Sequence, residues 1–230
     1  MSFATDAIAS LREVNPQSVE LAEAVSLAIR IEPELLREAR LHLVNKRADA
    51  SAESDLWFSN LVQKRSPLGI VLRYEIVDEL RAALALNKRR LDAARRLIVK
   101  MHQYLSPALK LEEDIIYYAL AGNRAAVRDA LRSALVTLVA PDRASLADWA
   151  VQAYDRLPLA IRESEEATNL ALAAALRTGE NPSLSSVGSA RLADSSWITS
   201  LLGATHRRCQ LWMRFIPGAL EFSRKPLPSA

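Results

Sequence analysis

Residues able to perform acid–base or metal chemistry are few in this sequence and lie far apart. The three histidines are His42, His102 and His206, and no HExxH pattern or cysteine at metal-ligand spacing accompanies them. The single cysteine, Cys209, is too close to His206 on an expected strand to serve as a nucleophile with its base. We therefore expect no metal site and no Cys–His catalytic pair.

One acid–base pair can be drawn from the sequence, with Glu112 facing His102 across the helix joint at Ser106 and Pro107. Acidic residues early in a helix also complement its dipole, so the structural interpretation is favoured. No GxGxxG, GxxxxGK[ST] or GxSxG pattern occurs, so neither a phosphate-binding loop nor a nucleophile elbow is present. We expect a protein that is not an enzyme and needs no cofactor.

Aromatic and arginine residues give the better candidates for binding. Trp57 and Phe58 follow a polar loop and precede a basic segment that contains Arg65. They belong either to the core or to a half-exposed groove, where aromatic residues and arginine would be good anchors for a partner. Trp212 and Arg214 lie together on one face of an alternating segment and are the second candidate pair.

The most basic segment, 88–100, gives an alternative binding site. On a helix, Arg89, Arg96 and Lys100 share a face and could contact the phosphates of a nucleic acid. The same segment also has an apolar stripe, which is typical of an ordinary amphipathic helix with a solvated polar face. The solvated face of an ordinary amphipathic helix is the favoured interpretation.

Helices must position the candidate residues of the first 178 positions. Glycine is scarce, and prolines stand where helices are expected to begin, as at Pro16, Pro33 and Pro107. A helix is also expected through Trp57 to Val62, ended by the sequence SPLG that follows it. The remaining breaks predict helices over 5–14, 16–30, 33–44, 73–86, 88–104, 107–121, 123–139, 144–156 and 158–178.

The last fifty residues have a different composition. Residues 179–204 are rich in turn formers and are expected to be a linker or loop with a short helix. From Arg207 the residues alternate in polarity, and Pro217-Gly218 predicts a turn, so 205–230 should form a β-hairpin or the start of a truncated β unit. We expect a mainly α protein, with a helical domain over 1–178 forming an irregular antiparallel bundle or short superhelix, and a C-terminal β-hairpin.

Composition limits the cellular setting. The lone cysteine cannot form an internal disulfide, and the N-terminus lacks the pattern of a signal peptide. No apolar run approaches the ~18 residues of a membrane span. The net charge of +3 is too small to indicate a nucleic-acid binder by itself. We expect a cytoplasmic protein that acts away from membranes.

Two segments resemble a known module. They are Ser54–Val62 (SDLWFSNLV) and Ser66–Leu72 (SPLGIVL), with Glu75 close behind. They are similar to a helical module of bacterial multidomain signalling and conflict proteins, found beside caspase-like peptidase, formylglycine-generating-enzyme-like or NTPase domains. The stretches 111–114 and 211–222 look similar too.

The resemblance implies an adaptor or regulatory part of a defence pathway and supplies no catalytic residues. It also implies that the β segment after 205 continues into a further domain, so that the end at 224–228 would be a truncation or a product of proteolysis. We therefore expect a non-catalytic protein-interaction or regulatory module of bacterial defence or stress signalling, acting as a protease substrate or inhibitory partner. Its partner would be a protein, such as a caspase-like or other peptidase or a signalling protein encoded nearby.

Overall fold

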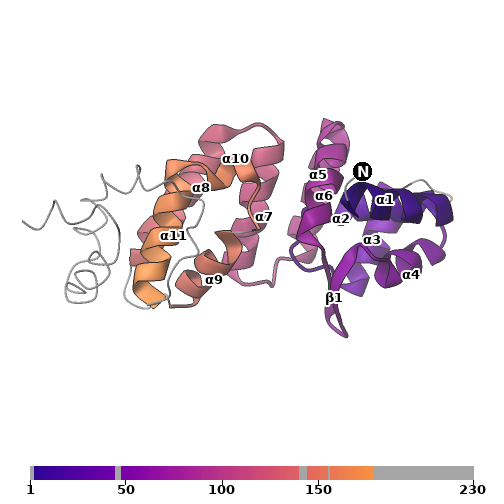
Figure 1. The fold of residues 1–230 in the computed structure, drawn as a ribbon, viewed down its shortest axis with the longest axis horizontal. Coiled ribbons are helices and arrows are strands. Elements are labelled where there is room, and N and C mark those ends of the chain that lie inside the picture. The colour runs from indigo at the N-terminus through magenta and orange to yellow at the C-terminus, as the bar shows by residue number, and fades with distance from the viewer. Residues whose placement is uncertain (1–2, 45–47, 140–143, 155, 179–230) are drawn as a thin grey trace, which may run out of the picture. The chain divides into compact units, whose positions relative to one another are not determined.

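The computed structural model describes residues 3–44, 48–139, 144–154 and 156–178. Within this part of the chain the fold is mainly α, as expected, with one two-stranded antiparallel sheet (Figure 1). The chain divides into two compact units, the first ending at Ala130 and the second beginning at Leu131. The expected helical range 1–178 thus includes the first unit and the described part of the second.

The expected helix starts at prolines are confirmed in the first unit. α1 (Phe3–Val14) is followed by α2 (Pro16–Val25) and α3 (Pro33–Leu43), and each proline opens its helix. The side chain of Asn15 caps α2 by accepting a hydrogen bond from the Gln17 amide at 3.0 Å. α2 ends five residues earlier than the expected Arg30, and the chain continues to α3 through turns.

The expected helix through Val62 is wrong. α4 (Ser51–Phe58) ends sooner. β1 (Val62–Ser66) and β2 (Gly69–Leu72) form an antiparallel hairpin in the segment expected to end a helix. The residues Ser-Pro-Leu-Gly at 66–69 have the preferences of a type I turn, with proline second and glycine fourth. They therefore connect two strands.

Tertiary packing stabilises this short hairpin. On the side of β2 away from β1, the backbones of Ile31 and Ile70 exchange two hydrogen bonds of 2.9 Å. Gly69 has a φ of +153°, and a Cβ there would lie 2.7 Å from the carbonyl oxygen of Ile31. Only glycine permits this approach. Val62 and Leu72 add buried apolar area, so the sheet is part of the core.

Three further helices complete the order of the first unit, α5 (Tyr74–Ala85), α6 (Lys88–Met101) and α7 (Pro107–Leu120). They begin close to the expected positions because Asn87 and Ser106 supply side-chain caps for α6 and α7. α2 contacts α1, α3, α4, α5 and α6 and is buried on nearly all sides, so it is the centre of the core. The largest fully buried side chains are Leu21, Leu27, Ile31, Leu35, Leu36, Leu56, Leu61, Ile70, Ile76, Leu80, Leu84 and Leu91.

α8 (Arg124–Val139) crosses from the first unit into the second, which continues with α9 (Ala144–Tyr154), α10 (Leu159–Arg162) and α11 (Glu165–Thr178). α11 packs on α9 and buries an alanine-rich face. Ser164 caps α11 by accepting a hydrogen bond from Ala167. The cap separates α10 from α11, so the single helix expected over 158–178 is wrong.

None of the described helices is long and apolar enough to cross a membrane. The linker expected over 179–204 and the hairpin expected over 205–230 lie outside the described residues, and so do Cys209, Trp212 and Arg214.

Candidate functional site

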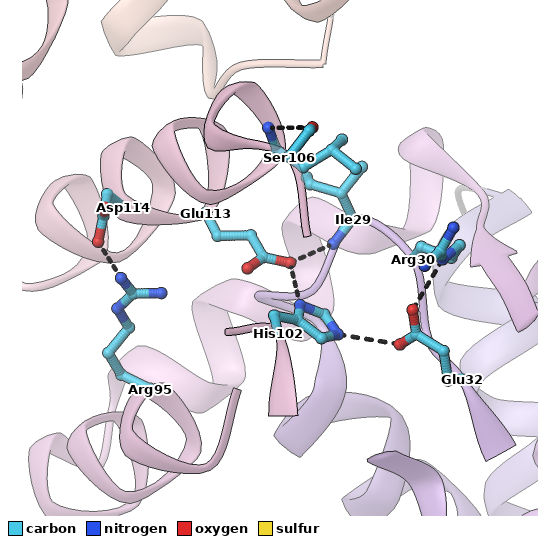
Figure 2. Close-up of polar contacts among 9 residues, drawn as sticks. Ile29, Arg30, Glu32, Arg95, His102, Ser106, Glu113 and Asp114 are labelled. Carbon is cyan, nitrogen blue, oxygen red and sulfur yellow. Dashed lines mark hydrogen bonds and ion pairs between the residues drawn. The ribbon is translucent and has the colours of Figure 1, made fainter. Parts of the chain in front are cut away.

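His102 is buried at the C-terminal end of α6, where it contacts charged side chains of two other segments (Figure 2). Its Nδ1 is 2.7 Å from Oε1 of Glu113 on α7, and its Nε2 is 2.9 Å from Oε2 of Glu32, the N-cap residue of α3. Arg30 donates to the other oxygen of Glu32 at 2.7 Å, and the Ile29 amide donates to Glu113 at 3.2 Å. We call His102, Glu113, Glu32 and Arg30 the histidine cluster.

The sequence suggested His102 and Glu112 as an acid–base pair. In the structure, the residue that contacts the ring of His102 is Glu113. Successive residues of a helix point about 100° apart, so Glu112 and Glu113 leave α7 in different directions. Both glutamates are buried, and sequence alone gave no reason to choose between them. Glu32, 70 positions from His102, had no detectable sequence signal at all.

The two carboxylates keep the imidazole protonated. Burial by itself lowers the pKa of His102, but hydrogen bonds and charge from Glu113 and Glu32 outweigh burial and raise the pKa to about 9. Burial likewise raises the pKa of Glu32, but hydrogen bonds from His102 and Arg30 bring the net value below its ordinary 4.5. At neutral pH the imidazole of His102 is therefore protonated, and its two ring nitrogens face Glu113 and Glu32. The C-terminal end of α6 further favours the imidazolium.

The histidine cluster is closed to a substrate. The His102 side chain is 2% exposed, and both ring nitrogens already face carboxylate oxygens of the same chain. A general acid or base needs one nitrogen within reach of a reacting atom. Among the described residues, no group of three or more His, Cys, Asp or Glu side chains could hold a metal ion. The contacts of His102 connect the end of α6 to α7 and to the start of α3, so the cluster holds these three helices together.

A second group of residues lies on the surface where α4 meets the hairpin and α5. Phe58 ends α4 with 74% of its surface exposed, and Tyr74 begins α5 with 55% exposed. The guanidinium of Arg73 lies 5.8 Å from the ring centre of Phe3, itself 57% exposed, and donates to the Asn60 carbonyl at 2.9 Å. Arg73 thus links the ring of Phe3 to the connection between α4 and β1.

Arg65 completes this region. It extends from β1 to the C-terminal end of α4, where it donates to the carbonyls of Trp57 at 2.6 Å and Ser59 at 2.7 Å. It thus satisfies helix-end acceptors that would otherwise need water. Of the candidates from sequence, Phe58 and Arg65 are exposed and neighbouring, while Trp57 is half-buried against the core. We call the set Phe3, Phe58, Arg65, Arg73 and Tyr74 the corner surface.

The basic residues of α6 fall into two classes. Arg90 donates to a Glu23 carboxylate oxygen at 2.6 Å, and Arg95 forms an ion pair with Asp114. Arg89, Arg96 and Lys100 are exposed, as the alternative interpretation requires. A helical wheel would have separated the two classes, because Arg90 and Arg95 border the apolar stripe and Arg89, Arg96 and Lys100 lie opposite it. The sixth basic residue, Lys88, is exposed at the start of the helix.

Comparisons of the chain with protein-family models, with curated proteins and with solved structures found no match.

Proposed function

We propose that the chain is a non-catalytic protein-interaction module and that its corner surface binds an acidic, partly apolar segment of a partner protein. The observation that carries the proposal is the group of exposed aromatic rings on α1, α4 and α5, together with Arg65 and Arg73, whose contacts tie the hairpin to the end of α4 and to Phe3. Aromatic residues and arginine dominate the residues that contribute most to binding at protein interfaces.

The corner surface is also well suited to binding because it is partly ordered beforehand. Arg65 and Arg73 are held by backbone carbonyls of the α4–β1 connection. Immobilising a flexible side chain at an interface costs about 0.5–1.5 kcal/mol, and these two contacts reduce that cost. The rings of Phe58 and Tyr74 have few rotatable bonds and would lose water-exposed apolar area on binding.

Charge supports an acidic partner. Lys64 and Arg65 are neighbouring exposed residues of β1, and Arg73 follows β2. Exposed carboxylates follow Tyr74 on α5, at Glu75, Asp78 and Glu79, so the excess of cations is confined to the hairpin. Carboxylates of a partner would find complementary charge beside the aromatic rings, which favours recognition and rapid association.

The resemblance to bacterial signalling and conflict proteins concerns the same part of the chain. Its segments, 54–62 and 66–72, form the end of α4 and the hairpin. We therefore include in the proposal a role as adaptor or regulator in bacterial defence or stress signalling. The partner would be a caspase-like or other peptidase, or a signalling protein encoded nearby. The closed histidine cluster supports a role without catalysis.

The test is affinity purification of the full chain from cells that also express the neighbouring genes. The wild type should recover a protein partner, and Phe58→Ala combined with Tyr74→Ala should lower recovery at least ten-fold, about the effect of losing one strong interface residue. Leu86→Ala, at an exposed apolar residue outside the corner surface, is the matched control and should not alter recovery. Recovery of no partner, or equal recovery by wild type and double variant, would contradict the proposal.

A further inference from the structure

We propose that the outward face of α6 is a second binding surface and that its ligand is the phosphate backbone of single-stranded nucleic acid. The face contains Arg89, Arg96 and Lys100, all exposed. At about 100° per residue the three positions fall within about 40° of one another, on the side opposite Ile98 of the buried stripe. We call these three residues the basic stripe.

Charge on α6 is far more one-sided than in the chain as a whole. The helix sequence KRRLDAARRLIVKM contains six cations and one carboxylate. That carboxylate, Asp92, accepts a hydrogen bond from the hydroxyl of Tyr117 at 2.9 Å. The chain's net charge of +3 is small because acidic residues elsewhere cancel this local excess. The local field decides whether a polyanion binds.

Within α6, structural needs explain only some of the cations. Arg90 and Arg95 are held by Glu23 and Asp114, so they stabilise the packing of this helix. The basic stripe makes no hydrogen bond or ion pair with any described residue. Three exposed cations on one face of α6 are therefore not used in contacts among the described residues.

The dimensions of the basic stripe fit a nucleic-acid strand. Arg89 and Lys100 are 11 positions apart, which spans about 16 Å along the helix at about 1.5 Å per residue. A strand that keeps its bases stacked as in B-DNA, with one phosphate per about 3.4 Å of axis, would present about five phosphates over that length. Three of them could be contacted at once, while an acidic protein segment has no such regular spacing of charge.

An exposed aromatic side chain beyond the helix favours a single strand over a duplex. Tyr104 follows the C-cap residue His102 by two positions and is 89% exposed. Unpaired bases can stack on such a ring, whereas the bases of a duplex are already stacked on one another. The basic stripe and Tyr104 together supply the two usual elements of single-strand binding, cations for the backbone and a ring for a base.

The experiment measures binding of the full chain to a fluorescent 12-nucleotide single strand over 50–200 mM salt. Three phosphate contacts predict a slope of about −2 in log K against log salt, or about 20-fold weaker binding over this range. Replacing all three stripe residues by alanine should weaken binding at low salt at least ten-fold and bring the slope toward zero. Tyr104→Ala should weaken binding to the single strand but not to a duplex of the same sequence.

The matched control is Arg12→Ala with Arg37→Ala and Arg128→Ala. It removes the same charge from exposed positions of α1, α3 and α8 and should leave binding nearly unchanged. No binding at 50 mM salt overturns the proposal, and so does equal loss in the control and stripe variants. Equal binding of an acidic peptide also overturns it, in favour of a protein partner. Because this test does not involve the corner surface, its failure would leave the proposed protein interaction unaffected.

Discussion

The charges of α6 differ sharply between its packed side and its outward side. At its C-terminal end, His102 is buried between two carboxylates of other segments. On the outward face, Arg89, Arg96 and Lys100 have no ionic partner among the described residues. Between them, Arg90 and Arg95 are partly exposed and form one ion pair each.

This difference teaches that the position of a charge relative to the buried stripe decides its role. A buried charge is costly unless paired, so the chain supplies partners for His102 from two directions. An exposed charge costs almost nothing and contributes little to stability, so the basic stripe remains available to ligands. The comparison can be tested by a series of substitutions whose effects on stability should follow the burial of each charge.

The largest effect is expected for Glu113→Ala. It leaves a buried imidazolium with one carboxylate and removes the acceptor of the Ile29 amide. Breaking a buried pair by deleting one member costs about 3–5 kcal/mol. Thermal and urea unfolding of the full chain at pH 7 will measure it. A loss of unfolding free energy below about 1 kcal/mol would contradict the expectation that the buried imidazolium needs both carboxylates.

A rise in pH should weaken the same cluster without any substitution. The pKa of His102 is about 9 in the folded chain against an ordinary 6.5. Its stabilising contribution is therefore complete below pH 6.5 and is lost as pH rises through about 9. The loss is on the order of 3 kcal/mol, since each unit of difference corresponds to about 1.4 kcal/mol.

Other groups also titrate in this range, so the measurement compares the wild type with His102→Gln from pH 7 to pH 10. The difference between their unfolding temperatures should shrink as pH rises, because only the wild type loses a proton at this position. A constant difference would show that the protonation of His102 does not contribute to stability. On the acid side, the lowered pKa of Glu32 predicts that its contribution is lost as pH falls below 4.5.

An intermediate effect is expected for Arg90→Ala. Its guanidinium donates to Glu23 and to the Glu20 carbonyl, both at 2.6 Å, and its side chain is about one quarter exposed. Hydrogen bonds to charged groups contribute about 1.5–3 kcal/mol each, and partial exposure reduces the net loss to about 1–2 kcal/mol. The loss should fall in 0.5 M salt, unlike that of Glu113→Ala, because salt screens exposed pairs more strongly.

The smallest effect is expected for alanine at all three positions of the basic stripe. Substitutions at exposed sites without a partner usually alter stability by less than about 0.5 kcal/mol each, and alanine favours the helix slightly. The urea midpoint of the triple variant should stay close to that of the wild type. A large loss would show that the stripe has a structural role and would break the comparison.

Local signals in the sequence predicted the helices well. Prolines at 16, 33 and 107 and the caps at Asn87 and Ser106 act on their own neighbours, so their effect can be read without the fold. The hairpin at 62–72 was missed because β1 has three successive exposed residues, and alternation is absent. Its position depends on Ile31, more than thirty residues earlier, which no local pattern contains.

The candidate sites, like the fold, were predictable where the signal is local and not where it depends on packing between distant segments. Phe58 and Arg65 were selected from residue type and proximity, and the hairpin brings them to one side of α4. The histidine cluster required knowledge of which helix faces meet, so the sequence suggested the wrong glutamate. The exposure of the Phe3 and Tyr74 side chains could not be predicted, because residue type alone does not decide whether an aromatic side chain at a helix start is buried.

The segment Arg30–Ile31–Glu32 connects two features that are otherwise separate. Ile31 is hydrogen-bonded to β2 through Ile70, while Glu32 on its other side contacts His102. The segment therefore joins the hairpin to the histidine cluster through one peptide unit, the one between Ile31 and Glu32. The backbone hydrogens of Ile31 and Ile70 are consequently natural reporters. Their exchange with deuterated solvent should accelerate beyond the general effect of base when His102 loses its proton.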